Sequence, residues 1–132
     1  MKIPKNGEYL GYHKNGKLSV RCYYKNGKLD GEYVRYHING KLRFKCNYKN
    51  NKRDGEYINY HKNGKLGIKC NYKDDKRDGE FLSYCDNGKL SFKFYYKDGK
   101  ELNKNFVENL ELILKWKYLK MVNIYVIIIM VN

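Results

Sequence analysis

Three histidines recur at an interval of 24 residues and are the first residues to consider for chemistry. They are His13, His37 and His61. Imidazole rings at one repeat position could hold a metal ion, but in successive hairpins of one sheet equivalent residues lie two strands apart, about 9.6 Å. Zinc ligands lie about 2 Å from the ion, so two of these rings cannot share one zinc. We therefore expect neither a metal site nor a cofactor, and each histidine should pack beside a turn.

Three cysteines follow the same interval, and a fourth does not. Cys22, Cys46 and Cys70 share one position, whereas Cys85 lies at another. The sheet geometry again separates equivalent residues by about 9.6 Å, and a disulfide needs Cα atoms within about 7 Å of each other. Phe94 occupies the fourth equivalent position, which suits a packing role. We expect small buried side chains in a reduced, intracellular protein.

Carboxylates also form rows with the same period. The rows are Glu8, Glu32, Glu56 and Glu80, and Asp30, Asp54 and Asp78. Paired carboxylates can act as general acid and base, but catalysis needs one asymmetric constellation rather than repeated copies. No nucleophile motif or phosphate-binding loop accompanies them. We predict that the chain is not an enzyme and that these carboxylates pair with neighbouring lysines.

The chain carries 28 Lys and Arg against 14 Asp and Glu, a net charge of +14, which favours anionic partners. The candidate binding surface is a basic face made of Arg21, Tyr23, Arg43, Lys45, Lys69, Lys93 and Tyr95. Such a face could stack single-stranded nucleic acid or lie on acidic lipids. It could equally be a solvated face whose lysines block edge aggregation. We favour the solvated face, then a general anionic surface, and give specific nucleic-acid recognition the least weight.

These rows exist because the chain repeats itself. Gly-Glu-aromatic triplets recur every 24 residues without insertion, which divides residues 7–102 into repeat 1 (7–30), repeat 2 (31–54), repeat 3 (55–78) and repeat 4 (79–102). The glycines at repeat starts and turns are Gly7, Gly16, Gly31, Gly40, Gly55, Gly64, Gly79 and Gly88. Repetition at a fixed period dictates the architecture.

Each repeat contains two turn signals. Asn-Gly pairs such as Asn15-Gly16 tolerate the positive φ angles of a tight two-residue hairpin turn. A second turn closes each unit at Asn26-Gly27, Asn50-Asn51, Asp74-Asp75 or Asp98-Gly99, of which the middle two are weaker signals. Two turns per repeat leave room for two short strands. The sequence therefore predicts an all-β fold: an elongated, single-layer, eight-stranded antiparallel meander of four hairpin repeats.

The segment after each Asn-Gly turn alternates with period two. In repeat 1 one side would carry Leu18, Val20, Cys22 and Tyr24, and the other Ser19, Arg21 and Tyr23. One apolar and one basic face is typical of an antiparallel sheet with one side in water. The segment before the turn is harder to orient, because Tyr9 and Tyr12 would face opposite sides of a regular strand. A bulge would change this, so its orientation stays open.

The pattern Gly-x-aromatic-x-x-Tyr, then Asn-Gly-Lys-Leu, then Tyr-Lys-x-Gly-Lys, resembles the variant class of MORN repeats (membrane occupation and recognition nexus). The resemblance runs from Gly7 to about Leu102. Asn51 and Asp75 depart from it at the second-turn glycine, and Cys85 departs from it at the histidine. Such repeats occur in antitoxin-like bacterial proteins and in large DNA viruses. The resemblance implies an elongated single-layer sheet, a scaffolding role, phospholipid contact in some members, and no enzyme active site.

Residues 103–132 change character and form a predicted capping segment. Apolar residues at three- and four-residue steps predict an amphipathic helix; they are Val107, Leu110, Leu114, Tyr118 and Met121. Asn103 or Asn105 could cap its start, with acids early and lysines late as the helix dipole prefers. The apolar run at 121–131 is too short to span a bilayer. It could form a strand, the end of the helix or a membrane contact.

A single sheet cannot fully bury its apolar face, so something should cover that face. The tail is the nearest candidate, near Phe92, Phe94 and Tyr96, and a second copy of the protein is the next. We predict a non-catalytic interaction or scaffold module whose partner is another protein. Association with anionic membrane lipids and an antitoxin-like role are the alternatives. The first six residues contain no apolar run and thus no secretory signal, which favours a cytoplasmic protein, with peripheral membrane attachment as the alternative.

Overall fold

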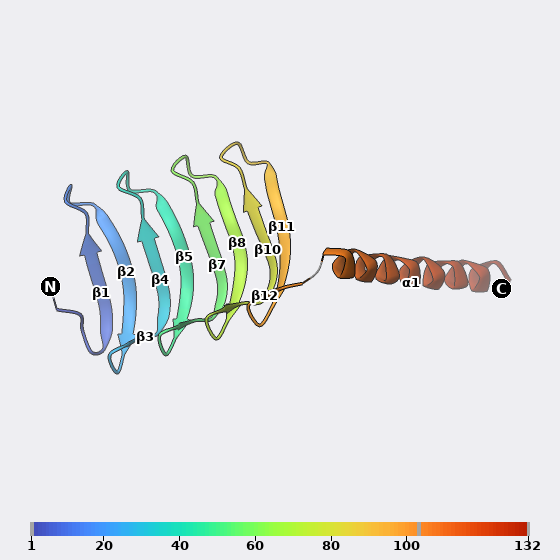
Figure 1. The fold of residues 1–132 in the computed structure, drawn as a ribbon, viewed down its shortest axis with the longest axis horizontal. Helices are drawn as coiled ribbons and strands as arrows, with labels where there is room; N and C mark the ends of the chain where they lie inside the picture. Colours follow the sequence, from blue (N-terminus) through green and yellow to red (C-terminus); the bar gives the residue numbers. More distant parts are fainter. Residues whose placement is uncertain (1, 103, 132) are drawn as a thin grey trace. The chain divides into compact units, whose positions relative to one another are not determined.

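The computed structural model describes the backbone of residues 2–102 and 104–131, and the side chains of residues 2–102, 111–123 and 130. The chain divides into two units, Met1–Glu101 and Leu102–Asn132, and each is described by itself. Within the described residues, the first unit is one open sheet of twelve strands in a single layer, and the second is one helix (Figure 1).

Each repeat contributes a long hairpin and a two-residue strand. The long strands are β1 (Gly7–Tyr12), β2 (Leu18–Lys25), β4 (Gly31–Tyr36), β5 (Leu42–Lys49), β7 (Gly55–Tyr60), β8 (Leu66–Lys73), β10 (Gly79–Tyr84) and β11 (Leu90–Lys97). The short strands are β3 (Lys28–Leu29), β6 (Lys52–Arg53), β9 (Lys76–Arg77) and β12 (Lys100–Glu101). Long strands pair in chain order, and each short strand pairs back on the long strand before it. The predicted meander of hairpin repeats is confirmed, but twelve strands replace the expected eight.

The loop inside each long hairpin differs from the two-residue turn that we predicted. In repeat 1 the His13 N–H donates to Lys17 O at 2.8 Å, and the Gly16 N–H donates to His13 O at 3.0 Å. These bonds enclose a three-residue loop in which Gly16 takes a positive φ of 84°. A turn followed by one left-handed residue is the usual three-residue hairpin loop, and glycine suits that position because it has no Cβ. Asn15 stabilises the loop through its side chain, because its Oδ1 accepts the Lys17 N–H at 3.0 Å.

The tight two-residue turn lies at the second signal. Asn26 and Gly27 have φ angles of 52° and 76°, and a type I′ turn requires both to be positive. The pairs with weaker signals take the same conformation, since Asn50 and Asn51 have φ angles of 49° and 66°. Asn and Asp enter this region more readily than other residues with a side chain. All four second turns are therefore alike, as predicted.

The register between long strands decides which side chains share a face. Tyr9 lies opposite Cys22, and a β-bulge between Gly11 and Tyr12 shifts the pairing that follows. Directly opposed residues of an antiparallel pair point to the same side of the sheet. The orientation that the sequence left open is therefore settled, because Tyr9 shares the face of the repeat cysteine.

We call the two sides of the sheet the aromatic face and the charged face. The aromatic face carries the positions of Tyr9, Gly11, Val20, Cys22 and Tyr24 in every repeat, and the charged face carries those of Glu8, Leu10, Arg21 and Tyr23. The charged face is not wholly polar, because it holds the aliphatic row of Leu10, Val34, Ile58 and Leu82. Val34 is only 3% exposed. Val34 lies directly opposite Arg21 on β2 and Lys45 on β5, and long cationic side chains cover such a neighbour with their apolar stems.

Neighbouring side chains on the aromatic face replace the second layer that this sheet lacks. The three repeat cysteines are buried, as predicted, and burial raises the pKa of the Cys46 thiol to about 11. Tyr33 and Tyr57 stack on the two sides of Phe44, with ring centroids 5.9 and 5.6 Å from its own. Contact along the row of rings thus buries apolar surface within one layer.

The tail is one continuous helix, α1 (Lys104–Val131). Residues 121–131 are therefore the end of a helix rather than a strand. The predicted placement of charged residues to suit the helix dipole is wrong at both ends. The first turn holds no acidic residue, and the last turn holds no basic residue. No helix in the described part of the chain is long and apolar enough to cross a membrane.

The helix is less amphipathic than the sequence pattern predicted. Among its described side chains, large apolar groups are exposed on many sides of this unit: Leu112, Ile113, Leu114, Trp116, Tyr118, Leu119 and Met121. The cap expected at Asn103 lies outside the described residues, and so do the side chains of Asn105, Val107 and Leu110. That the tail covers the sheet stays a prediction.

Candidate functional site

The basic surface predicted from the sequence lies mainly on the charged face, where glutamates partly neutralise it. Glu32 lies 2.9 Å from Arg21 and 3.4 Å from Lys45, and Glu80 lies 3.2 Å from Lys93. Burial by itself would raise the pKa of Glu32, but hydrogen bonds from Lys45 and Arg21 hold it below its usual value. The predicted pairing of glutamates with nearby cations is confirmed for these two residues.

Other members of the predicted surface are joined less closely. The Tyr23 hydroxyl donates to Glu8 at 3.2 Å, and the Lys93 Nζ lies 5.1 Å from the centre of the Tyr95 ring. Lys69 forms no ion pair with any residue that the structure describes. The charged face therefore holds small clusters rather than one continuous cationic site.

Arg43 lies apart from the rest of the predicted surface. The bulge in repeat 2 passes from the pair of Arg35 and Phe44 to the pair of Tyr36 and Leu42, so Arg43 is the extra residue. Its guanidinium lies 6.0 Å from the centre of the Phe44 ring. The sequence assigned it to the basic face by strict alternation, which a bulge interrupts.

The repeated histidines join successive repeats. Their Nε2 atoms lie next to backbone oxygens of the following repeat: His13 is 3.0 Å from Tyr36 O, His37 is 3.0 Å from Tyr60 O, and His61 is 2.8 Å from Tyr84 O. Because a carbonyl oxygen only accepts, Nε2 donates. Each histidine lies beside a turn as predicted, but its bond to the next repeat was not foreseen. Repeat 4 is followed by no further repeat, and there Cys85 replaces the histidine.

Two departures from the repeat pattern also join repeats. The Oδ1 of Asn51 accepts the Leu29 N–H at 2.7 Å, and the Oδ1 of Asp75 accepts from Arg53 Nε at 2.6 Å. The hydrogen bond from Arg53 lowers the pKa of the Asp75 carboxyl. Glycine at these two positions would leave the second turn without a side-chain acceptor.

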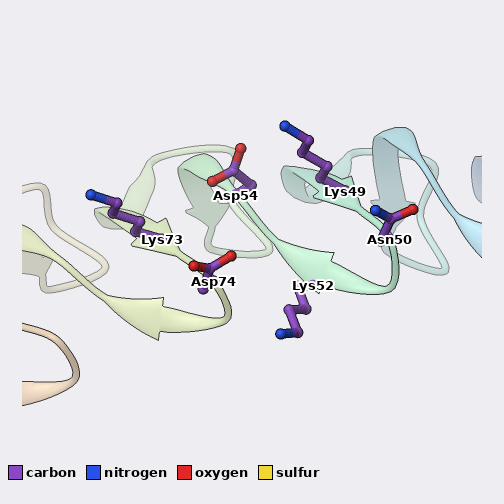
Figure 2. A pocket seen from close by; sticks show the side chains of 6 residues that line it. All are labelled: Lys49, Asn50, Lys52, Asp54, Lys73 and Asp74. Atoms are coloured by element: carbon purple, nitrogen blue, oxygen red, sulfur yellow. The ribbon is translucent and has the colours of Figure 1, made fainter.

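A hollow of about 270 Å³ lies at the second turns of repeats 2 and 3 (Figure 2). Its lining residues are Lys49, Asn50, Lys52, Asp54, Lys73 and Asp74. Figure 2 shows the side chains of Lys49 and Lys52 extending in opposite directions, so the polar groups do not converge. Among the described residues, no group of three or more His, Cys, Asp or Glu could hold a metal ion. We interpret the hollow as open turn surface.

Arginines lie against rings of the aromatic face, an arrangement that the sequence did not predict. The guanidinium carbon of Arg53 is 4.2 Å from the centre of the Tyr72 ring, and that of Arg77 is 4.6 Å from the centre of the Phe81 ring. Both arginines belong to the two-residue strands, which are too short to produce a periodic sequence signal. A cation over an aromatic ring is favourable, so these side chains stabilise the rings that they cover.

A third arginine stands in the middle of the aromatic face. Arg35 lies opposite Val20 on one neighbouring strand and opposite Phe44 on the other. Its Nε donates to the Tyr33 hydroxyl at 3.1 Å. Alternation from Tyr33 would have placed Arg35 on this face, had the face of Tyr33 been known from the sequence.

Four consecutive segments of the chain match the family model described as the MORN repeat variant, at residues 5–26, 29–50, 53–74 and 77–98. The chain belongs to this MORN repeat family. The resemblance drawn from the repeat pattern is thus confirmed. No curated protein matches the chain.

Each matched MORN segment ends on the first residue of a second turn. The match therefore covers the long hairpins and also the histidine bonds between them. MORN repeats are generally non-enzymatic elements and suggest a module for binding or scaffolding. The family does not specify the partner, so the chemistry of the partner must be inferred from the surface of these particular repeats.

Proposed function

We propose that this chain is a non-catalytic protein-interaction module that binds its partner on the aromatic face. The observation that carries the proposal is the exposure of a large apolar side chain there in repeat 4. Phe92 lies opposite Ser83 on the aromatic face, and it is 45% exposed. Its ring centroid lies 6.4 Å from that of Phe81 and 5.1 Å from that of Phe94. A contiguous apolar patch that is partly exposed on a protein surface commonly marks an interaction site.

The composition of the face supports the same conclusion. Tyrosine and arginine are enriched where protein interfaces concentrate their binding energy. Arg35 and Arg77 lie against Tyr33 and Tyr96 here, with Arg35 donating to one hydroxyl at 3.1 Å and Arg77 to the other at 3.3 Å. On the charged face, by contrast, several cationic side chains form ion pairs with glutamates of the same face, which leaves them less available to a partner.

Selection from a displayed peptide library tests this proposal. Wild-type protein should enrich peptides, and Phe92→Thr should weaken their binding because it removes an exposed apolar anchor but keeps a good strand former. Lys69→Asn is the matched control, since it changes an exposed residue of the charged face. If no peptide is enriched, or if only Lys69→Asn abolishes binding, the aromatic face is not the interaction surface.

Peripheral association with anionic membrane lipids is the second candidate. It is favoured by the net charge of +14 and by the exposed Trp116 and Tyr118 of α1, which flank a lysine, since such residues favour membrane interfaces. In that case Lys69 and its neighbours on the charged face would meet the headgroups. Sedimentation with anionic but not neutral vesicles, lost at high salt, would support it; absence of sedimentation would exclude it.

An antitoxin-like role and a cytoplasmic location remain part of the proposal. The first rests on the resemblance of the repeats to those of antitoxin-like bacterial proteins, and the second agrees with the four free cysteines among the described residues, of which three are buried. Affinity purification from the native host, followed by identification of a toxin as the bound protein, would support the first. Fractionation of the native host would test the second.

A further inference from the structure

One row of residues crosses the aromatic face at right angles to the strands. Its members are directly opposed in successive strand pairs: Gly11, Val20, Arg35, Phe44, Asn59, Ile68, Ser83 and Phe92. We call it the crossing row. Because strands are spaced by about 4.8 Å, the five strand steps from Arg35 to Phe92 span about 24 Å.

The two ends of this path differ in chemistry. Equivalent positions hold Gly11, Arg35, Asn59 and Ser83 in repeats 1 to 4, so repeat 2 alone places a cation there. Arg35 forms no ion pair with any described residue. A guanidinium that already donates to a tyrosine hydroxyl retains donors suited to a carboxylate.

Charge along the array has the same direction. Repeat 2 holds seven Lys and Arg against two Asp and Glu, whereas repeat 4 holds four of each. These counts include both faces; on the crossing row itself, the repeat 4 end is Phe92, which is 45% exposed. The row therefore leads from Arg35, a cation without an ion pair among the described residues, to an exposed aromatic side chain at Phe92.

Two other occupants fit this row less well. Nucleobases need free ring faces on which to stack, but Phe44 is stacked between Tyr33 and Tyr57 at interplanar angles of 14° and 27°. The chain's own tail has the wrong charge, because residues 104–131 carry four lysines and two glutamates. An external protein segment with an acidic end fits the charge better.

We propose that the crossing row is a directional docking track for an amphipathic protein segment, with the segment's acidic end on Arg35 and its apolar end on Phe92. This inference rests on the proposed function and adds the chemistry and polarity of the partner. A helix rises about 1.5 Å per residue, so a path of about 24 Å corresponds to about 16 helical residues. The segment would cross the strands rather than add a strand to the sheet.

The probe is a fluorescein-labelled, helix-forming peptide of about 16 residues, with a block of glutamates at one end and leucine and phenylalanine at the other. A second peptide has glutamine in place of every glutamate. Binding to full-length protein is measured by fluorescence anisotropy. Arg35→Ser and Phe92→Thr test the two ends of the track, and Lys69→Asn removes one positive charge from the opposite face. Arg35→Ser places at this position the residue that Ser83 already provides in repeat 4, so the fold should be retained.

We expect the glutamate peptide to bind wild-type protein about tenfold more tightly than the glutamine peptide, the factor that one charge-assisted hydrogen bond commonly supplies. Arg35→Ser should remove that preference, and Phe92→Thr should weaken both peptides. Lys69→Asn should change neither by more than about twofold. Equal binding of the two peptides to wild-type protein, or an equal loss with Lys69→Asn, would overturn the inference.

Further outcomes separate this inference from the proposed function. If library peptides bind through Phe92 but show no acidic preference and ignore Arg35→Ser, the interaction face stands and the directional track falls. If neither designed nor library peptides bind, both fall. Binding of phosphatidylglycerol vesicles or of single-stranded oligonucleotide that depends on Arg35, without peptide binding, would assign the row to a membrane or a nucleic acid and overturn the inference.

Discussion

The substitution His37→Ala removes a hydrogen bond that joins repeat 2 to repeat 3. The Nε2 of His37 donates to Tyr60 O at 3.0 Å in a half-buried position. Other hydrogen bonds also cross this boundary, among them Asp75 N–H to Arg53 O at 3.0 Å and Asn39 Nδ2 to Lys62 O at 3.3 Å, but the strand pairing across it is short. β5 and β7 share two residue pairs, Phe44 with Asn59 and Lys45 with Ile58, whereas six pairs join β4 and β5 within repeat 2. In an array of repeats, stability depends on such nearest-neighbour interfaces.

The magnitude follows from the geometry. A hydrogen bond of this length contributes about 1 kcal/mol net, and an acceptor left without a partner costs about 1–3 kcal/mol when it is buried. The Tyr60 carbonyl is only partly shielded, so we expect His37→Ala to lower the free energy of unfolding by about 1–2 kcal/mol. For a folded unit of this size, each kcal/mol lowers Tm by about 4–8 °C.

Urea denaturation followed by circular dichroism measures the change, and the chain contains its own control. Cys85 occupies the histidine position of repeat 4, is exposed, and has no following repeat to bind. Cys85→Ala should therefore change the free energy of unfolding by less than about 0.5 kcal/mol. If His37→Ala and Cys85→Ala lower stability equally, the histidine does not join the repeats and the reasoning is refuted.

Three more predictions follow from other contacts. Arg53 lowers the pKa of the Asp75 carboxyl, so the ion pair stabilises the protein at neutral pH and this contribution is lost as pH falls through the carboxyl range. Asp75→Asn, which keeps an oxygen acceptor, should destabilise by less than about 1 kcal/mol near pH 7 and by a smaller amount near pH 3; an equal loss at both pH values contradicts this. A thiol reagent near pH 8 should label the exposed Cys85 quickly and spare Cys46, whose pKa is raised by burial to about 11; rapid labelling of several thiols contradicts this. If the tail covers the sheet near Phe92, as the sequence predicted, deleting residues 103–132 should lower Tm and solubility. The docking track instead requires that the truncated protein keep its Tm and its binding of the glutamate peptide.

Most of the fold could be predicted from the period of 24 residues. The period predicted the positions of the strands and turns and the burial of the repeat cysteines, because each depends on local propensity repeated four times. Asn-Gly, however, suits both a two-residue turn and the end of a three-residue loop. The structure uses the second option at Asn15-Gly16 and the first at Asn26-Gly27. Local sequence cannot separate them, because the choice depends on which strand residues pair.

The candidate surface was predicted less well, for a related reason. Alternation places residues reliably only within one uninterrupted strand. Because of the bulge between Gly11 and Tyr12, the sequence does not reveal on which face Tyr9 lies. The bulge in repeat 2 makes the prediction from alternation wrong for Arg43. Arg35 was missed because the segment before the turn could not be oriented. The glutamate pairs were foreseen, since Glu32 and Lys45 recur at fixed positions whatever the face.

Residues that recur in every repeat hold the sheet together, so information about a partner must lie where the repeats differ on an accessible face. The exchange of Arg35 and Ser83, as the double variant Arg35→Ser with Ser83→Arg, tests this idea. Both residues already occur at this repeat position, and the net charge does not change. Stability should therefore stay within about 0.5 kcal/mol of wild type.

The exchange moves the cation next to Phe92, which lies directly opposite residue 83. A peptide with its acidic and apolar blocks at opposite ends should lose affinity, and a peptide with the two blocks adjacent should gain it. Fluorescence anisotropy with both peptides measures the change in preference. If the peptide with separated blocks binds wild-type and exchanged protein equally well, partner recognition does not depend on where along the repeats the arginine lies. In that case the identical features of the four repeats, rather than their differences, would determine what this sheet binds.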